Sequence, residues 1–149
     1  MRFRLPDWDV EMPAPLVSYW AAWNETDLGR VREHLASAVT QDIDWNDPRD
    51  SITGIDELEA AIHRLRTSKP AYRFAIASEV DHHHNRYRYR WDMVSSGRTL
   101  MEGLDIATID VSVGLICRVD GFFGNPTPLT GHQSGVPAGL KSDSLGDSD

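Results

Sequence analysis

The sequence contains little cysteine and no long apolar run. Its single cysteine, Cys117, cannot form a disulfide within the chain, and it excludes a zinc site built from several cysteines. No stretch reaches the roughly 20 apolar residues that cross a bilayer, and the first residues lack the apolar core of a signal peptide. We therefore expect a cytoplasmic protein with no membrane partner.

Basic residues are also in the minority. Lysine and arginine together number 15, against 23 aspartates and glutamates, so the net charge is −8. A protein that binds a phosphate backbone needs clustered basic side chains to neutralise it. Arg86, Arg88 and Arg90 form one short basic run, but Asp81 and Asp92 bracket it. No nucleic-acid partner is expected.

The length of 149 residues fits a single domain followed by a tail. Residues 125–149 are rich in proline, glycine, serine and aspartate and show no apolar periodicity, which predicts a disordered C-terminal tail. The folded domain is accordingly expected over residues 1–124.

Apolar residues recur at helical spacing in the first half of the chain. The segments concerned are residues 14–25, 26–39 and 54–68. Thr26 or Asp27 fits the N-cap of the second segment. Asp56 fits the N-cap of the third, with Glu59 three residues later as in a capping box. The expected buried stripes are Leu16, Tyr19, Trp20 and Trp23, then Leu28, Val31, Leu35 and Ala38, then Ile55, Leu58, Ile62 and Leu65.

From Ala71 onward the apolar period changes to two, which is typical of strands. The strand-length runs are residues 72–80, 85–94, 99–109 and 114–123, with a short strand pair expected near 38–45. Helices followed by an antiparallel meander predict an α+β domain, in which the helices pack on one side of a curved sheet.

This order of elements, together with four short motifs, resembles the nuclear transport factor 2-like superfamily. The motifs are Y-W-A-A-W-N-x-x-D-L in the first helices, W-N-D-P before the third, G-x-D on the third long strand and R-V-D-G-F-F-G on the last. The SnoaL-like and ketosteroid isomerase-like branch is the most similar, over roughly residues 14–124. The resemblance implies a cone-shaped fold, with three N-terminal helices on a curved antiparallel or mixed sheet that encloses a cavity.

The resemblance also implies three catalytic residues. Steroid isomerases of this fold use a tyrosine on the first helix, a basic aspartate in a D-P turn and a protonated aspartate on a strand. These match Tyr19, Asp47 and Asp105 by position. Removing a proton next to a carbonyl group creates an enolate, so a carboxylate must accept the proton and two donors must meet the oxyanion. The implied activity is a cofactor-free isomerase for an apolar, steroid-like or polyketide-like carbonyl substrate.

The expected strand pairing conflicts with a protonated Asp105. If Ser96 and Gly97 form a two-residue hairpin turn, Arg88 lies opposite Asp105, on the same face of the sheet. An arginine beside Asp105 would favour the ionised carboxylate and lower the pKa of Asp105. The isomerase role needs the neutral acid instead.

The same pairing predicts which side chains of the strand at 85–94 point to each face of the sheet. The arginines and Asp92 would face the cavity, and Tyr87, Tyr89, Trp91 and Met93 would lie outside. An exposed row of such side chains predicts a homodimer through the outer face of the sheet. The ligand expected in the cavity is a small apolar organic molecule. The predicted substrate-binding residues are Trp23, Trp45, Asn46, Arg88, Arg90, Asp92 and Asp120.

Two other functions remain open. Limonene-type epoxide hydrolases share the fold and use Arg-x-Asp on one strand, an aspartate on the last strand and an asparagine; Arg90, Asp92, Asp120 and Asn46 look similar. A tyrosine of that set is replaced by Asp44. In a non-catalytic ligand carrier, Arg88 would neutralise Asp105, and Asp47 would cap the turn before Pro48.

His82, His83 and His84 are expected in a turn between two strands. Adjacent strand residues point to opposite faces, so three consecutive histidines cannot all reach one metal ion. Neither a metal site nor a cofactor is predicted.

Overall fold

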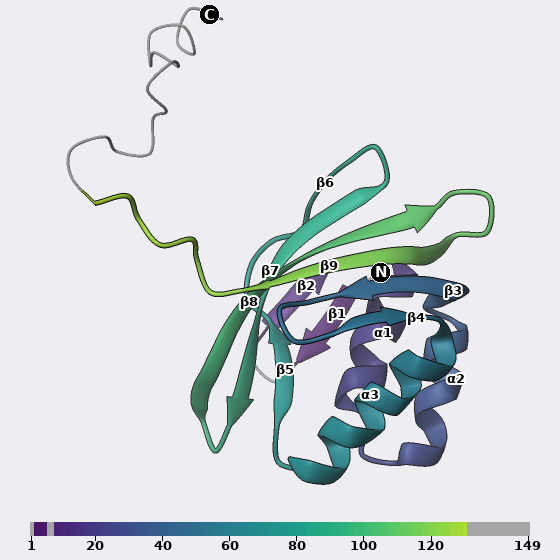
Figure 1. Cartoon of the computed structure of the whole chain (residues 1–149), viewed down its shortest axis with the longest axis horizontal. Helices are drawn as coiled ribbons and strands as arrows, with labels where there is room; N and C mark the ends of the chain where they lie inside the picture. The colour runs from purple at the N-terminus through teal and green to yellow at the C-terminus, as the bar shows by residue number, and fades with distance from the viewer. Residues whose placement is uncertain (1, 6–7, 131–149) are drawn as a thin grey trace, which may run out of the picture.

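A computed structural model describes residues 2–5 and 8–130 (Figure 1). Its helices are α1 (Ala14–Asn24), the 3-10 turn η1 (Leu28–Arg30), α2 (Val31–Ala36) and α3 (Ile55–Ser68). Its strands are β1 (Arg2–Leu5), β2 (Trp8–Glu11), β3 (Val39–Asn46), β4 (Ser51–Thr53), β5 (Arg73–Ile76), β6 (Asp81–His83), β7 (Arg86–Ser95), β8 (Arg98–Asp110) and β9 (Leu115–Phe123). The predicted α+β class is confirmed, and β1, β2 and β6 are additions that the sequence did not indicate.

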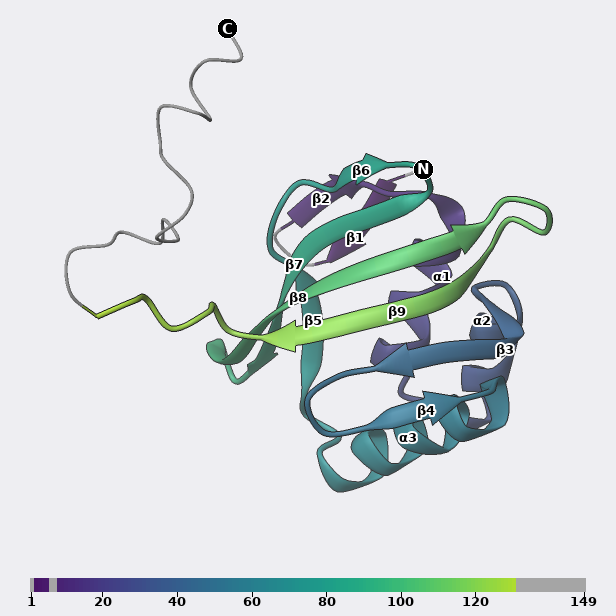
Figure 2. The same ribbon diagram turned by 45° about the horizontal axis from the view of Figure 1, so that its top comes forward.

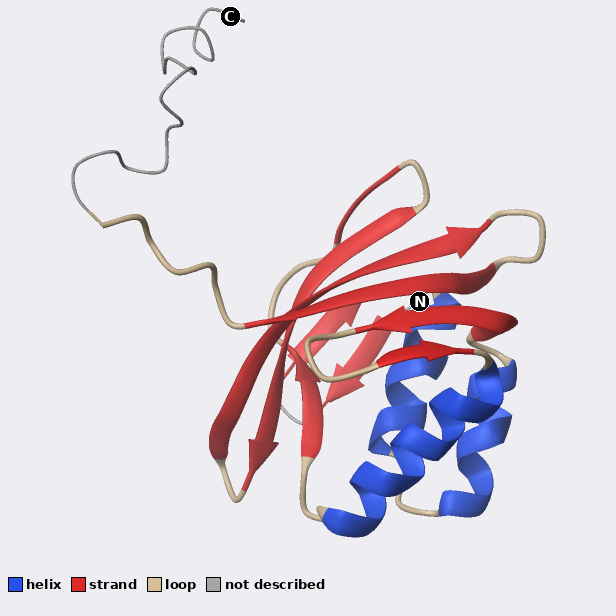
Figure 3. Ribbon diagram, viewed as in Figure 1, coloured by secondary structure: helices blue, strands red, loops and turns tan. Residues whose placement is uncertain are grey.

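The main sheet is mixed and open. Its strands run in the order β4-β3-β9-β8-β7-β5, with β6 on the free part of β7 (Figure 2). Only the β3–β9 pair of this sheet is parallel within the described residues. The helices lie together on one side of the curved sheet (Figure 3), and β1 and β2 form a separate hairpin. This arrangement confirms the expected cone.

The helices bury most of the stripes that their spacing predicted, although Leu28 and Leu65 are only half-buried. Leu16, Tyr19, Trp20 and Trp23 of α1 are all buried. Asp27 caps the second helical segment, because its side chain accepts a hydrogen bond from the backbone N–H of Gly29.

The predicted cap of α3 is wrong. Gly54, at a φ of 96°, is the N-cap, and the helix begins at Ile55. A positive φ suits glycine, and it turns the chain sharply out of β4 into the helix. Asp56 therefore lies in the first turn, where its carboxylate favours the helix N-terminus and accepts a hydrogen bond from Arg32 over 2.7 Å.

The β7–β8 hairpin has the predicted turn but a different register beyond it. Ser95 pairs with Arg98 and Val94 with Thr99, as a two-residue turn at 96–97 requires. Met93 then pairs with Met101, so Leu100 is an extra residue on β8 and forms a bulge. The expected pairing of Arg88 with Asp105 is wrong.

A shift of one residue in the β7–β8 register exchanges the side chains that point to the two faces of β7. Tyr89, Trp91 and Met93 point into the core and are 1%, 5% and 9% exposed, while Arg88 and Arg90 lie on the outer face. The aromatic row is covered by the helices, so it needs no second subunit. The homodimer stays a prediction, without the argument that supported it.

Arg66 is a buried cation that the sequence did not single out. Its guanidinium donates to the backbone oxygens of Trp23, Pro70 and Tyr72 at 3.4, 2.8 and 2.6 Å. Burial lowers its pKa, with a smaller contribution from Arg73. These bonds tie the end of α3 and the following loop to α1.

The remaining sequence-based expectations concern the histidines and the ends of the chain. His82 and His83 lie on β6 and His84 in the turn to β7, and all three are exposed. Residues 125–130 form neither helix nor strand, and residues 131–149 of the predicted tail lie outside the described residues. No helix in the described ranges combines the length and apolarity needed to cross a bilayer.

Candidate functional site

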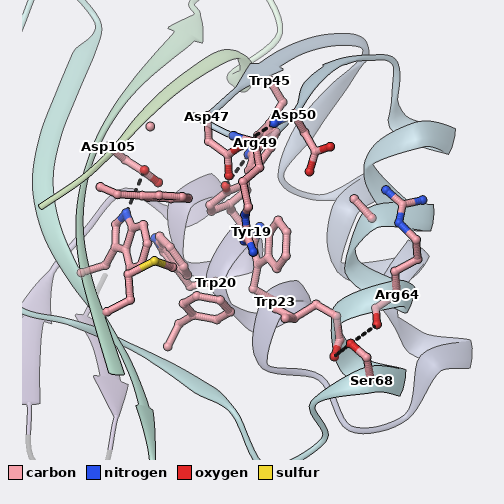
Figure 4. A pocket seen from close by; sticks show the side chains of 17 residues that line it. Tyr19, Trp20, Trp23, Trp45, Asp47, Arg49, Asp50, Arg64, Ser68 and Asp105 are labelled. Atoms are coloured by element: carbon pink, nitrogen blue, oxygen red, sulfur yellow. Dashed lines mark hydrogen bonds between the residues drawn. The ribbon is translucent and has the colours of Figure 1, made fainter. Parts of the chain in front are cut away.

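A cavity of about 350 Å³ lies between the helices and the concave face of the sheet (Figure 4). This volume is within the range typical of small-molecule sites. Seven aromatic side chains line it: Tyr19, Trp20, Trp23, Trp45, Phe74, Trp91 and Phe123.

Asp105 is a carboxyl group among these rings, and only 4% of its surface is exposed. Trp91 Nε1 donates to its Oδ1 over 2.9 Å, and the Tyr89 hydroxyl donates to its Oδ2 over 3.3 Å. Trp20 Nε1 in turn donates to the Tyr89 hydroxyl oxygen over 2.9 Å. This chain of hydrogen bonds fixes the position of the carboxyl group.

Burial raises the pKa of Asp105 to about 7. The hydrogen bonds from Trp91 and Tyr89 favour the carboxylate and oppose that rise, whereas the negative charges of Asp47 and Asp120 add to it. Asp105 thus exchanges its proton near neutral pH, which suits a group that donates or accepts a proton in a reaction.

Tyr19 places a phenol in the same cavity. Its oxygen accepts a hydrogen bond from Trp45 Nε1 over 2.7 Å, and its own hydrogen meets no acceptor among the described residues. Burial, followed by the charge of Asp105, raises the pKa of Tyr19 well above its ordinary value. Tyr19 is therefore a neutral phenol that can donate a hydrogen bond to a ligand.

Asp47 lies in the loop after β3 and lines the cavity together with Tyr19 and Asp105; we call these three residues the floor. Its Oδ1 accepts hydrogen bonds from the backbone N–H groups of Arg49 and Asp50, each over 2.8 Å. Its Oδ2 has no hydrogen-bond partner in the part of the chain that the structure describes. The turn therefore holds the carboxyl group in place and leaves one oxygen available.

Gly121 makes room for the two carboxyl groups. A Cβ atom at this position would lie 2.9 Å from Asp105 Oδ1 and 3.5 Å from Asp47 Cβ. The first of these separations is shorter than a carbon and an oxygen tolerate. The absence of a side chain on β9 thus lets Asp47 and Asp105 border the same space.

Of the predicted site residues, five line the cavity and five do not. The five that line it are Tyr19, Trp23, Trp45, Asp47 and Asp105. The structure brings these five residues to one cavity, and their roles in binding and catalysis remain predictions.

The expected positions of Arg88, Arg90 and Asp92 in the cavity are wrong, because the Leu100 bulge turns them to the outer face. There Arg88 Nη2 contacts Asp81 Oδ2 over 2.5 Å, and Arg90 bonds to Asn125 over 3.0 Å. Among the alternate positions of β7, Trp91 lines the cavity instead.

Asn46 and Asp120 also lie outside the cavity, because they alternate with Trp45 and Gly121 along their strands. Asn46 bonds to Asp44 and Ser51, and Asp120 Oδ2 accepts from Arg118 over 2.8 Å. The residues expected for an epoxide hydrolase therefore do not line the cavity, and the structure does not support that alternative.

Twelve residues that line the cavity were not among the predicted site residues. They are Trp20, Arg49, Asp50, Ala61, Arg64, Leu65, Ser68, Phe74, Trp91, Met101, Gly121 and Phe123. A signal existed for Trp20 and Leu65, which belong to the apolar stripes of their helices and were assigned to the core alone. Trp91 and Met101 depend on the bulge, for which the sequence carries no clear mark.

Within residues 2–5 and 8–130, no three histidine, cysteine, aspartate or glutamate side chains are arranged to hold an ion. The polar groups of the cavity floor are instead the two carboxyl groups and the phenol.

Comparison with known proteins gives a match among solved structures. No model of a known protein family matches the chain, and no curated protein matches it. The crystal structure of a proposed isomerase of the SnoaL-like family from Agrobacterium tumefaciens is 31% identical, covers 74% of this chain and 95% of its own, and has a TM-score of 0.69.

Two more distant structures share the fold. A proposed polyketide cyclase from Sinorhizobium meliloti is 13% identical, covers 74% of this chain and 94% of its own, and has a TM-score of 0.60. A proposed SnoaL-like polyketide cyclase from Jannaschia is 11% identical, with coverages of 78% and 90% and a TM-score of 0.56. The 31% identity to the Agrobacterium protein, over most of both chains, shows that this chain belongs to the SnoaL-like family.

Proposed function

We propose that the protein is a cofactor-free isomerase that moves a proton within an apolar carbonyl compound. The observation that carries this proposal is the buried Asp105 carboxyl group, which faces the same aromatic cavity as Asp47 and Tyr19. The Agrobacterium relative, itself a proposed isomerase, is consistent with it.

In the proposed reaction, the carbonyl oxygen of the substrate accepts hydrogen bonds from the Tyr19 hydroxyl and from protonated Asp105. The Asp47 carboxylate removes a proton from the carbon next to the carbonyl group, so a C–H bond breaks and an O–H bond forms. The resulting enolate is stabilised by the two donors. Asp47 then returns the proton to another carbon of the conjugated system, and both carboxyl groups end in their starting states.

The environment of Asp105 supports a donor role. A group with a pKa of about 7 is protonated in a large fraction of molecules at neutral pH. An apolar ligand that displaces water from the cavity adds to the desolvation and favours the neutral acid further. The sequence predicted Arg88 opposite Asp105, which would have favoured the anion. In the structure Tyr89 is opposite Asp105, and Arg88 lies on the outer face.

A second candidate is a ligand-binding protein without catalysis. It is favoured by one observation: Asp47 Oδ1 caps a turn, a task that aspartate performs in many loops with no chemical role. The two candidates share the cavity and the ligand class, and they differ in whether Asp47 moves a proton.

A β,γ-unsaturated cyclic ketone separates them, since its conversion to the conjugated isomer is followed by ultraviolet absorbance. The isomerase proposal predicts turnover, which Asp47→Asn abolishes while ligand affinity changes little, because a base acts in the transition state. Asparagine retains Oδ1, so the turn persists. Asp92→Asn, on the outer face, is the control and retains turnover. Binding of the ketone with no turnover by the unmodified protein would instead favour the binding protein.

A further inference from the structure

The exposed end of the cavity carries a group of charged residues that the proposed reaction does not use. Arg49 and Asp50 follow Asp47 in the loop after β3, and Arg64 lies on α3. All three line the cavity, and all three are exposed. In Figure 4, Arg64 lies across the cavity from Asp105. We call these three residues the mouth.

The two mouth arginines lack acidic partners. Neither Arg49 nor Arg64 forms an ion pair within the described residues, and Arg49 lies over the ring of Phe123 at 5.4 Å. In contrast, Arg32 and Arg118 each contact two carboxylates. The chain as a whole has a net charge of −8, yet two unpaired guanidinium groups lie at one end of the cavity. Asp50 offsets one of them, so the mouth keeps a positive excess.

The floor of the cavity has the opposite character. A ligand carboxylate placed there would lie near the negative charge of Asp47, and burial among the aromatic rings would remove its hydration. A ligand that carries a carboxylate should therefore bind with that group directed outward. At the mouth, water still reaches the charge, and an arginine offers paired donors that match a carboxylate.

We propose that the ligand is an elongated acid, with its carbonyl group on the floor and a carboxylate at the mouth beside Arg64 and Arg49. This orientation rests on the proposed function, which assigns the carbonyl group to Tyr19 and Asp105. The mouth then selects among apolar carbonyl compounds by charge at the end remote from the reaction.

Three probes of similar shape test this assignment. 2-Naphthol places a phenol oxygen where the enolate oxygen would be; 6-hydroxy-2-naphthoic acid adds a carboxylate at the far end, and its methyl ester adds a neutral group. Quenching of tryptophan fluorescence reports binding, since four tryptophans line the cavity. We expect the acid to bind about three- to fivefold more tightly than the ester at low ionic strength, as for a solvent-exposed ion pair. The gain should disappear in about 1 M salt.

Charge variants locate the effect. Arg64→Gln should remove most of the difference between acid and ester, and Asp50→Asn should enlarge it, because an opposing charge is lost. Arg86→Gln is the matched control: this exposed arginine lies outside the cavity, at the start of β7, and its loss should leave the difference unchanged. Equal binding of acid and ester by the unmodified protein, or equal effects of Arg64→Gln and Arg86→Gln, would overturn the inference.

Asp105→Leu distinguishes this failure from failure of the proposed function, because leucine has no donor, whereas the amide of asparagine could replace the protonated carboxyl group. If all three probes weaken in Asp105→Leu, the floor binds the phenol as proposed, and the acid–ester comparison then judges the mouth alone. If 2-naphthol binds Asp105→Leu unchanged, the proposed role of the floor is wrong, together with the carbonyl end of the inferred orientation. A preference for the acid that depends on Arg64 would even then support the mouth as the carboxylate site.

Discussion

Tyr89 lies directly opposite Asp105 in the ladder between β7 and β8, and its hydroxyl group donates to Asp105 Oδ2 over 3.3 Å. With Trp91 at the other oxygen and Trp20 behind the tyrosine, both carboxyl oxygens accept hydrogen bonds from donors held in the core. The proton affinity of Asp105 is therefore a balance between burial, which favours the neutral acid, and these donors, which favour the anion.

Removing the Tyr89 hydroxyl should shift this balance. Tyr89→Phe takes away one bond to the carboxylate, so we expect the pKa of Asp105 to rise by about one to two units, since hydrogen bonds to charged groups contribute roughly 1.5–3 kcal/mol. Tyr87→Phe is the control, because Tyr87 stacks on His82 and makes no bond to Asp105. A pH titration of both variants by NMR checks the shift, and an unchanged or lowered value in Tyr89→Phe would contradict it.

The stability of the protein should depend on pH through Asp105. Its pKa is about 7 in the folded state, against an ordinary value of 3.8, so the folded state holds the proton more tightly. Stability from this group is fully present below about pH 4 and is lost as pH rises to about 7, by roughly 4 kcal/mol. Urea unfolding of the unmodified protein and of Asp105→Asn across this range should diverge by that amount. Parallel curves would show that Asp105 does not titrate as described.

A side chain at position 121 should disturb the floor. In Gly121→Ala, the new Cβ would lie 2.9 Å from Asp105 Oδ1, so the carboxyl group or the strand must move. We expect a loss of about 1–3 kcal/mol in the free energy of unfolding, as for other overpacked sites, together with weaker ligand binding. Calorimetry and a binding titration measure the two effects. Unchanged ligand affinity would mean that Gly121 does not shape the floor.

Arg66→Met should destabilise the protein more than Arg64→Gln does. The backbone oxygens of Pro70 and Tyr72 keep a donor in Arg73, but the buried oxygen of Trp23 loses the bond from Arg66, so we expect a loss of about 1–3 kcal/mol. Arg64→Gln changes an exposed side chain, so its effect on stability should stay within about 0.5 kcal/mol. Denaturant unfolding of the two variants compares them directly. Similar losses would show that the Trp23 oxygen does not depend on Arg66.

Much of the fold could be predicted because it follows from local periodicity. The stripe from Leu16 to Trp23 and the change to period two after Ala71 each mark an element whose one face must be buried. The cap of α3 was misplaced because Asp56 and Gly54 both suit a helix start. The deciding feature was the positive φ of Gly54, which depends on how β4 enters the helix.

The candidate site could be predicted only in part. The family motifs placed Tyr19, Asp47 and Asp105 together, and the structure brings them to one cavity. The prediction of what surrounds Asp105 was wrong, because those neighbours depend on the register between β7 and β8. One extra residue, Leu100, exchanges Arg88 for Tyr89 as the neighbour of Asp105, and no glycine or proline marks that bulge in the sequence.

The pKa of the Asp105 carboxyl group tests the central claim most directly. Carboxyl ¹³C NMR of the unliganded protein follows the titration, and the signal missing from Asp105→Asn assigns it. We predict a midpoint of about 7, because burial outweighs the hydrogen bonds from Trp91 and Tyr89. A midpoint below about 4, the ordinary range of aspartate, would leave an anion at neutral pH that cannot donate to a substrate oxygen and would contradict the proposed role of Asp105.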